Sequence, residues 1–239
     1  MNLWPPGIGL VRLAEVDSTN AEARRRAEAG EAGPLWITAG RQTQGKGRRG
    51  RAWETGLDNL AATLLLQPDA PPAQAAQLSF AAALAVADLA AHYAPDVAVT
   101  VKWPNDVLAR GRKLAGILLE VGRDWLAVGI GVNLTSYPED TEFPATSLPA
   151  LGVVPPTPDE ALVVLAARFA HWQAAWAAQG FAPLRTAWLA RAGRLGLPIR
   201  ARLPHEERQG AFEGIDETGA LLLREPGGLR AITAGEVFF

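Results

Sequence analysis

The chain has 239 residues, 49% of them hydrophobic, and a formal net charge of −2. These values fit a folded protein with one sizeable core, or a large domain with a small appendage, and argue against disorder. The absence of cysteine excludes disulfides and thiolate zinc sites, and three widely separated histidines argue against a histidine-rich metal site, so no metal-binding residues are predicted. The N-terminus lacks a signal-peptide pattern and no segment is typical of a membrane span, so we expect a soluble, cytoplasmic protein without membrane contact.

Apolar alternation and helical periodicity predict a chain in which strands and helices are mixed. Helices are predicted over residues 21–29, 73–93, 158–179 and 181–191. Strands are predicted over residues 8–16, 35–39, 59–66, 97–103, 107–109, 114–120 and 125–134. Residues 110–113 should form the tight turn of a hairpin.

The pattern changes near Gly193, Gly196 and Pro198. Beyond them, short strands are predicted over residues 199–203, 210–215, 219–224 and 229–238. A segment of about 40 residues buries little core alone, so it should be a small barrel or meander docked on the main domain. We therefore predict two domains, 1–192 and 193–239, and expect the long connection 135–157 to be a functional lid or disordered.

A glycine-rich basic loop over residues 40–53 is the centre of the chemistry. Its cations are Arg41, Lys46, Arg48, Arg49 and Arg51, it contains no acidic residue, and Gly45, Gly47 and Gly50 lie between them. Such a loop suits a phosphate or carboxylate and should be mobile when empty. It partly matches two nucleotide-binding glycine patterns, but no helical pattern follows it, which argues against both. A solvated basic loop is the structural alternative.

Other polar stretches have both a structural and a functional interpretation. Asp17-Ser18-Thr19 can cap a helix or direct hydroxyls into a pocket. In Lys102-Trp-Pro-Asn-Asp106, the polar residues can close a turn or bring an amide and a carboxylate to the strand ends. Asn105 or Asn133 could pair with an adenine edge. Lys113 can be a surface lysine or a cation for a phosphate.

Together these stretches resemble the biotin protein ligase family. The matching motifs, in the family's order, are Asp17-Ser-Thr-Asn20, Gln42-x-x-Gly-Lys-Gly-Arg-Arg-Gly-Arg51-x-Trp53, Lys102-Trp-Pro-Asn-Asp106, Arg112-Lys-Leu-Ala-Gly-Ile-Leu-Leu-Glu120 and Gly129-Ile-Gly-Val-Asn133. Residues 214–223 are similar to the family's small C-terminal domain. Lys46 departs from the pattern, because the family commonly has arginine there. The resemblance implies an α+β fold, a mixed sheet flanked by helices like that of class II synthetases, followed by an SH3-like barrel.

The resemblance also implies a reaction. Biotin's carboxylate attacks the α-phosphate of ATP, with Mg²⁺, to give biotinyl-5′-AMP, and a lysine of a biotin carboxyl carrier protein then takes the biotin. This is the activity of a biotin–[acetyl-CoA-carboxylase] ligase. No helix-turn-helix precedes residue 8, so nucleic-acid binding is not expected, and a homodimer is possible.

By resemblance, each motif residue receives an expected role. The biotin-binding residues would be Ser18, Thr19, Asn20, Gln42, Gly45, Lys46, Gly47, Arg48, Lys113, Gly116 and Gly129. The nucleotide-binding residues would be Arg48, Arg51, Trp53, Asn105, Lys113 and Asn133. The catalytic residues would be Lys113, Arg48 and Asp106. Residues 40–58 and 137–148 would close over the reactive anhydride.

Two alternatives stay open. The first is a lipoate or octanoate ligase or transferase on the same fold. The second is a non-catalytic nucleic-acid-binding module that uses the basic loop, which should show a broader basic face and a higher isoelectric point.

Overall fold

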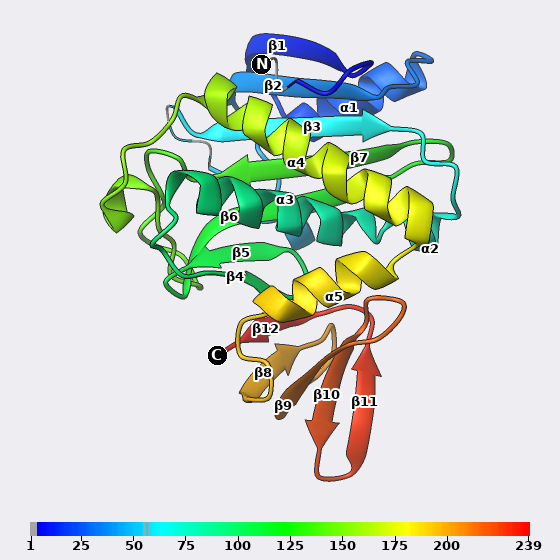
Figure 1. Cartoon of the computed structure of the whole chain (residues 1–239), viewed down its shortest axis with the longest axis vertical. Helices are drawn as coiled ribbons and strands as arrows, with labels where there is room; N and C mark the ends of the chain where they lie inside the picture. The colour runs from blue at the N-terminus through cyan, green and yellow to red at the C-terminus, as the bar shows by residue number, and fades with distance from the viewer. Residues whose placement is uncertain (1–3, 55, 57) are drawn as a thin grey trace.

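The computed structural model describes residues 4–54, 56 and 58–239, and its larger part is built on one mixed sheet (Figure 1). The first two strands of this sheet pair in parallel and the other neighbours are antiparallel. In spatial order the strands are β1 (Gly9–Val16), β2 (Leu35–Gln42), β3 (Leu60–Leu66), β7 (Leu126–Val132), β6 (Arg112–Val121), β5 (Asp106–Ala109) and β4 (Val99–Lys102).

The centre of the sheet is the junction of β3 with β7. Strands β4 to β7 form a meander of sequence neighbours, whereas β3 meets β7 only after that meander is complete. In this junction Thr63 lies opposite Gly129. Every residue of β3 and β7 is buried, as expected for strands covered on both faces.

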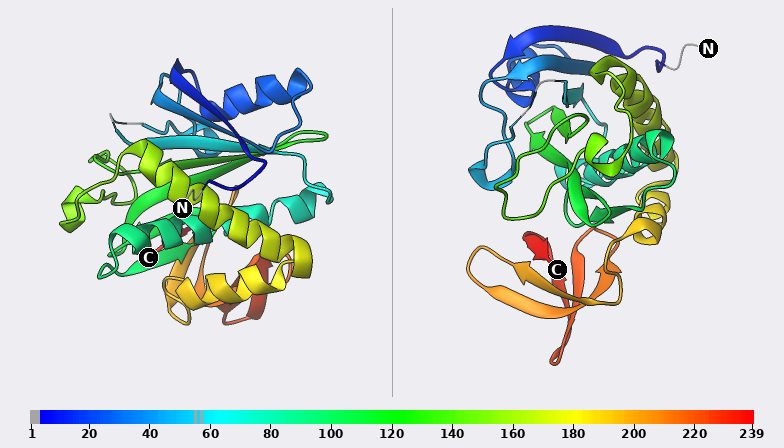
Figure 2. Two further views of the ribbon diagram at one scale, coloured as in Figure 1. Left: turned by 45° about the horizontal axis from the view of Figure 1, so that its top comes forward. Right: turned by 90° about the vertical axis from the view of Figure 1, so that its left-hand side faces the viewer.

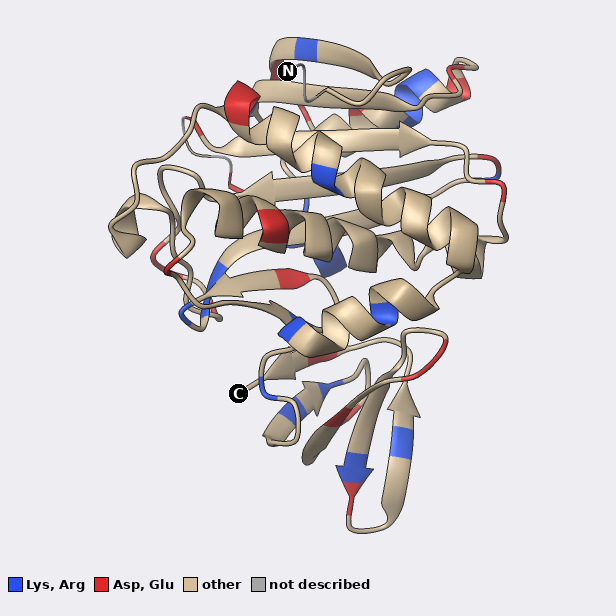
Figure 3. Ribbon diagram, viewed as in Figure 1, with Lys and Arg blue, Asp and Glu red and all other residues tan. Residues whose placement is uncertain are grey.

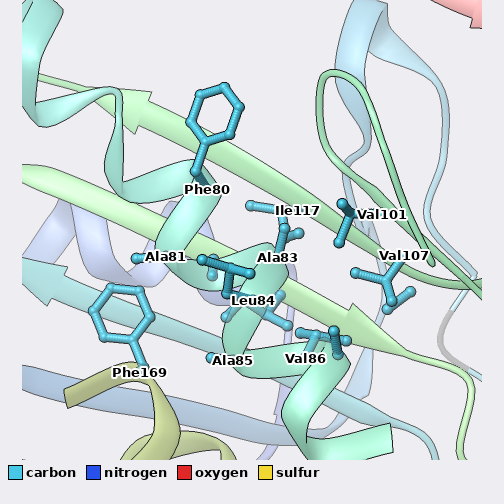
Figure 4. Close-up of a cluster of buried hydrophobic side chains, with 14 of the residues drawn as sticks. Phe80, Ala81, Ala83, Leu84, Ala85, Val86, Val101, Val107, Ile117 and Phe169 are labelled. Carbon is cyan, nitrogen blue, oxygen red and sulfur yellow. The ribbon is translucent and has the colours of Figure 1, made fainter. Parts of the chain in front are cut away.

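One face of the sheet is covered by α3 (Leu78–Tyr93) and α4 (Pro158–Gln179). Helix α3 is apolar around most of its circumference, because it lies between the sheet and α4. Figure 4 shows this core, which includes Phe80, Leu84, Val101, Val107 and Phe169. A capping box of Thr157 and Glu160 begins α4.

The predicted helix 73–93 is interrupted. Helix α2 (Pro72–Ala75) is followed by two turn residues, 76 and 77. Around this turn the N–H groups of Gln77 and Ser79 donate to carbonyls three residues earlier and not four. Within the described residues, Pro72–Tyr93 is one stretch long and apolar enough to cross a membrane, but 67% of its apolar 18-residue portion is buried inside the structure. Its apolarity is therefore that of a core helix.

Helix α1 (Thr19–Glu28) lies on the opposite face (Figure 2). Ala23 of α1 packs in a small cluster with Ile37, Leu65 and Ala127, which is separate from the cluster around α3. Successive strand residues point to opposite faces, so alternate residues of one strand serve the two clusters. The helix begins two residues earlier than predicted, and Thr19 and Asn20 therefore lie in its first turn.

Helix α5 (Ala182–Arg191) leads into a second, antiparallel sheet of five strands, consistent with an SH3-like domain. Its spatial order is β11 (Gly228–Ile232), β10 (Leu221–Glu225), β9 (Glu207–Ile215), β8 (Pro198–Arg202) and β12 (Glu236–Phe238). The prediction of one strand over 229–238 is wrong. A bend at residues 233–235 divides it into β11 and β12, which lie at opposite edges of the sheet.

Candidate active site

A cavity of about 360 Å³ opens on the face of the main sheet that carries α1. It is lined from three directions: the first turn of α1, the glycines of β6 and β7, and strand β12 of the small domain. Of the site residues predicted from the sequence, the structure places these at the cavity: Ser18, Thr19, Asn20, Gln42, Lys46, Gly47, Arg48, Arg51, Trp53, Asn105, Asp106, Lys113, Gly116, Gly129 and Asn133.

Gly45 is the predicted site residue that does not line the cavity. It begins a small hairpin in which Trp53 N–H donates to the Gly45 carbonyl (2.9 Å) and Gly47 N–H to the Arg51 carbonyl (2.7 Å). A Cβ at position 45 would collide with the Trp53 backbone. Gly45 therefore shapes the basic loop, and its neighbours contact the cavity.

The floor of the cavity is made of glycines. Gly116 of β6 pairs with Gly131 of β7, and the Trp53 ring lies against both, where side chains would otherwise stand. At Gly129, one step along β7, Asn20 fills the corresponding space. Gly131 belongs to the motif Gly129-Ile-Gly-Val-Asn133 but was not among the predicted site residues.

One end of the cavity is polar and uncharged. The Gln42 side-chain oxygen accepts from the backbone N–H of Thr19 (2.8 Å), so Gln42 caps the first turn of α1. Ser18 occupies the N-cap position, but its hydroxyl makes no capping hydrogen bond, although the residue is only 2% exposed. The N-terminal end of α1 therefore presents the buried Ser18 hydroxyl to the cavity, beside a first turn that is held by the Gln42 amide.

Asp17 supports this turn from outside. Arg25 donates to both carboxylate oxygens (2.9 and 2.7 Å), and Ser18 N–H donates to Oδ1 (2.8 Å). The hydrogen bonds from Arg25 lower the pKa of Asp17 to about 2. The carboxylate therefore stays charged and fixes the start of α1 over the ordinary pH range.

The other end of the cavity is charged and centred on Asp106. Its two oxygens contact Lys113 Nζ (2.7 Å) and Lys102 Nζ (3.1 Å). Burial by itself raises the pKa of Asp106, but the two lysines outweigh it and hold the pKa below its usual range. Asp106 is therefore an anchored carboxylate that holds Lys113 beside the Trp53 ring, whose centroid is 5.6 Å from Nζ.

Lys113 was predicted to lie in the hairpin turn, but the structure places it in strand β6. The turn is closed by Arg110 and Gly111 alone, both with positive φ, as a two-residue hairpin turn requires. Lys113 is consequently held in the sheet, with its side chain 27% exposed. Its position is fixed by backbone pairing as well as by Asp106.

Lys102 lines the cavity, although the sequence analysis did not assign it to the site. It is 6% exposed, its Nζ donates to the Val237 carbonyl (3.2 Å), and the same nitrogen lies 3.8 Å from the centroid of the Phe143 ring. Burial lowers the pKa of Lys102, and the Asp106 charge opposes that effect. The lysine joins the charged end of the cavity to strand β12.

The basic loop lies against the small domain. Arg48 donates to the Asn105 side-chain oxygen (3.4 Å) and to the Gly235 carbonyl (3.1 Å). Burial, followed by the charge of Arg49, lowers the pKa of Arg48. Glu236 of β12 forms ion pairs with Arg51 and with Arg49 (3.5 Å to the latter) and is only 13% exposed. The loop contains no acidic residue, and this counter-charge comes from the far end of the sequence.

The two amides predicted for the adenine side also hold the backbone. Asn105 donates to the Ile117 carbonyl (2.6 Å), and Asn133 donates to the carbonyls of Lys113 (3.4 Å) and Thr146 (3.0 Å). The segment around Ala145 pairs with Lys113, so this part of the predicted lid 137–148 is anchored to β6. Both amides lie at the cavity wall, with these donor groups already bonded.

Figure 3, seen from the side of α3 and α4, shows few charged residues on these two helices and residues of both signs spread over the small domain. The charged residues at the cavity are contributed by segments far apart in sequence. The cavity therefore combines local positive charge with buried carboxylates. This combination suits a reaction between two anions better than the simple attraction of a polyanion.

Comparisons with known proteins agree with this architecture. The sequence model of the "Biotin/lipoate A/B protein ligase family" matches residues 13–134, and that of the "Biotin protein ligase C terminal domain" matches residues 195–239. The chain is 49% identical to a biotin–[acetyl-CoA-carboxylase] ligase of Paracoccus denitrificans, over 95% of this chain and 99% of the relative. A ligase of the same name from Mycobacterium tuberculosis is 37% identical, over 94% and 86% of the two chains. The structure of a biotin protein ligase from Aquifex aeolicus in complex with biotin and ATP superposes with a TM-score of 0.85 at 28% identity, covering 96% of this chain and 97% of that one.

Proposed function

Because the chain belongs to the biotin/lipoate A/B protein ligase family, we propose that it is an ATP-dependent biotin protein ligase. It would activate biotin as biotinyl-5′-AMP and then transfer the biotin to a lysine of a biotin carboxyl carrier protein. The observation that carries this proposal is the division of one cavity into a neutral hydrogen-bonding end and a cationic end, joined by a glycine floor. Such a shape suits a ligand with a polar ring, an apolar chain and a carboxylate.

In the first step, an oxygen of the biotin carboxylate attacks the α-phosphorus of ATP and pyrophosphate leaves. Two anions must approach each other, so cations fixed at the reacting centre lower the barrier. Lys113 would contact both the carboxylate and the α-phosphate, and Arg48 and Arg51 would contact the phosphates. The Asp106 contact holds Lys113 in place before the ligands arrive.

In the second step, the acceptor lysine attacks the acyl carbon and AMP leaves. The amine must be neutral to attack, and its proton needs an acceptor. We propose Asp106 for this role, which requires that it exchange a contact with Lys102 or Lys113 for one with the incoming amine. Because the pKa of Asp106 is lowered, the carboxylate would accept the amine proton only transiently and pass it to the departing AMP phosphate or to water.

Magnesium would enter with the triphosphate. The described residues contain no group of three or more acidic or histidine side chains that could hold a metal ion by themselves. Magnesium commonly keeps several waters and binds through substrate phosphates and one or two carboxylates. Asp140, an exposed carboxylate at the cavity, could supply one ligand, and the ion would neutralise phosphate charge.

The mixed anhydride reacts with water, so closure over it would protect the intermediate. We propose that residues 40–58 and 137–148 provide this cover, although residues 55 and 57 lie outside the described residues. Glu142 near the mouth bonds Arg202 (2.7 Å) and contacts Arg51 (3.7 Å), so both segments already meet the small domain.

The alternatives fit the cavity less well. Lipoate offers a ring without N–H or C=O groups, and it would leave the hydroxyls and amides around Ser18 and Asn20 without partners. A nucleic-acid module would use the loop cations at the surface, whereas Arg48 is partly buried and Arg49 and Arg51 are paired with Glu236. The biotin reaction uses both sets of groups.

Several further properties belong to the proposal. We place the domain boundary between residues 192 and 193, although residues 1–3 of the first domain lie outside the described part. We propose a cytoplasmic protein that acts on a carboxyl carrier protein, without nucleic-acid or membrane contacts. A homodimer is compatible with this activity.

Mass spectrometry of the purified protein with magnesium-ATP and either biotin or lipoate tests the central proposal. We expect a biotinyl-adenylate and no lipoyl-adenylate, and biotin transfer when a carboxyl carrier domain is added. Formation of lipoyl-adenylate alone would support the same-fold alternative. If neither adenylate forms, the proposed function is wrong.

A further inference from the structure

A buried hydroxyl behind the cavity connects two residues of its polar end. Thr63 is the one polar residue of β3, and it is 0% exposed. Its Oγ1 lies 2.7 Å from the Asn20 side-chain oxygen and 2.8 Å from the Thr19 hydroxyl oxygen. Thr63 does not itself line the cavity, whereas Thr19 and Asn20 both do.

The orientation of the Asn20 amide follows from its backbone partner. The Leu118 carbonyl can only accept a hydrogen bond, so the amide atom 3.2 Å from it must be the nitrogen. The amide oxygen therefore points to Thr63 and occupies the space above Gly129. One N–H of the amide is used by Leu118, and the second is available to a ligand in the cavity.

This arrangement fixes the proton of Thr63. An amide oxygen cannot donate, so the single hydroxyl proton of Thr63 must point to Asn20. The Thr63 oxygen then accepts from the Thr19 hydroxyl. With its proton directed to Thr63 (2.8 Å) or to the Gln42 side-chain oxygen (3.1 Å), the Thr19 oxygen presents only acceptor capacity to the cavity. The Gln42 oxygen accepts from the Thr19 backbone N–H (2.8 Å), and it is the more distant of the two acceptors within reach of the Thr19 hydroxyl.

We infer that Thr63 is a positioning and specificity residue that sets the hydrogen-bond polarity of the ring-binding end: an acceptor at Thr19 beside a donor at Asn20. A cyclic urea, with a C=O flanked by N–H groups, matches this pattern. A ring without these groups does not. The inference rests on the proposed function for the identity of the ligand, and it adds that discrimination depends on a residue that never contacts the ligand.

The test compares T63V, which keeps the shape of the side chain and removes the hydroxyl, with T63S, which retains it. Adenylate formation is measured with biotin and ATP varied separately, and biotin binding is measured by calorimetry. For T63V we expect KM and Kd for biotin to rise about 10- to 100-fold, the loss of one or two hydrogen bonds within a buried network. KM for ATP should stay within about twofold of the wild-type value, and T63S should stay within about threefold for both substrates.

Thr38 provides a matched control. Its hydroxyl, on the neighbouring strand β2, is also buried and donates to the Ala61 carbonyl (3.0 Å), but it does not contact Thr19 or Asn20. T38V should therefore leave KM for biotin unchanged. If T63V does not fold, T63C, whose thiol donates only weakly, replaces it.

Two ligands and one double variant complete the design. Dethiobiotin keeps the urea and should lose affinity for T63V as biotin does. In the N20A background, T63V should have little further effect on biotin affinity, because the network has already been broken. Wild-type biotin affinity in T63V, or equal losses for biotin and ATP, would overturn the inference while wild-type adenylate formation still supports the proposed function. Wild-type protein that neither binds nor activates biotin would overturn both.

Discussion

Replacing Asp106 with asparagine should weaken both the fold and the first reaction step. The substitution keeps the size of the side chain but removes the charge between Lys102 and Lys113. Breaking a buried ion pair by removing one partner costs about 3–5 kcal/mol. Lys102 retains the Val237 carbonyl and the Phe143 ring, and an asparagine oxygen can still accept, so we expect the lower end, about 3 kcal/mol of unfolding free energy.

The pH dependence of this loss has a definite sign. The folded pKa of Asp106 is depressed, so its contribution to stability is fully present above the unfolded pKa, near 3.8. It is lost as the pH falls through the lower, folded pKa. The difference in unfolding free energy between wild type and D106N should therefore be constant above about pH 5 and shrink below pH 4.

Urea denaturation followed by tryptophan fluorescence measures this difference. D159N is the matched control, because Asp159 forms an ion pair with Arg12 at 2.9 Å in which both side chains are more than half exposed. That variant should change stability by less than about 0.5 kcal/mol. In parallel, loss of the Lys113 contact should slow adenylate formation about 10- to 100-fold. A D106N protein as stable as D159N, or with wild-type adenylation, would refute the reasoning.

Two other predictions concern the charged end. K113A should lose at least about 100-fold in the rate of adenylate formation while remaining folded, because Lys113 contributes charge and little packing; K46A, at the loop position that departs from the family, should lose much less. A K113A enzyme with wild-type rates would exclude Lys113 from the first step. E236Q should release the basic loop, so trypsin should cleave after Arg48, Arg49 or Arg51 several-fold faster than in wild type, with magnesium, ATP and biotin protecting both proteins. Equal cleavage of wild type and E236Q without ligand would show that Glu236 does not hold the loop.

Much of the fold could be predicted from local pattern. The main strands and α4 lie close to their predicted ranges, because apolar alternation and helical periodicity are strong over these lengths. The strand predicted over 229–238 was wrong because the short bend Thr233-Ala234-Gly235 contains no proline or charged residue to separate the two apolar stretches on either side. The interruption before α3 was not predicted for a similar reason. The alanine-rich run remains compatible with a helix through residues 76 and 77.

The lining of the cavity was predicted where the residues are adjacent in a motif and missed where they meet across the fold. Lys102 belongs to a recognised motif, but its burial depends on Phe143 and strand β12. Glu236 and Thr63 stand alone in ordinary strand sequences, and their partners lie far away along the chain. A cue in the sequence was the charge imbalance of the basic loop, which required a carboxylate from elsewhere.

The junction between β3 and β7 has a consequence for how the protein is made. Strand β3 leaves the ribosome well before β7, so its hydrogen-bonding edge waits for the whole meander β4 to β7 to be synthesised. The polar end of the cavity belongs to the early half of the sheet, and Lys113 belongs to the late half. A ligand that contacts both halves would bind only when the junction is formed, and it would therefore stabilise the folded sheet. At 100 times its Kd it would add about 2.7 kcal/mol to the cohesion of the sheet, so cellular ligand supply would influence how long the finished protein survives.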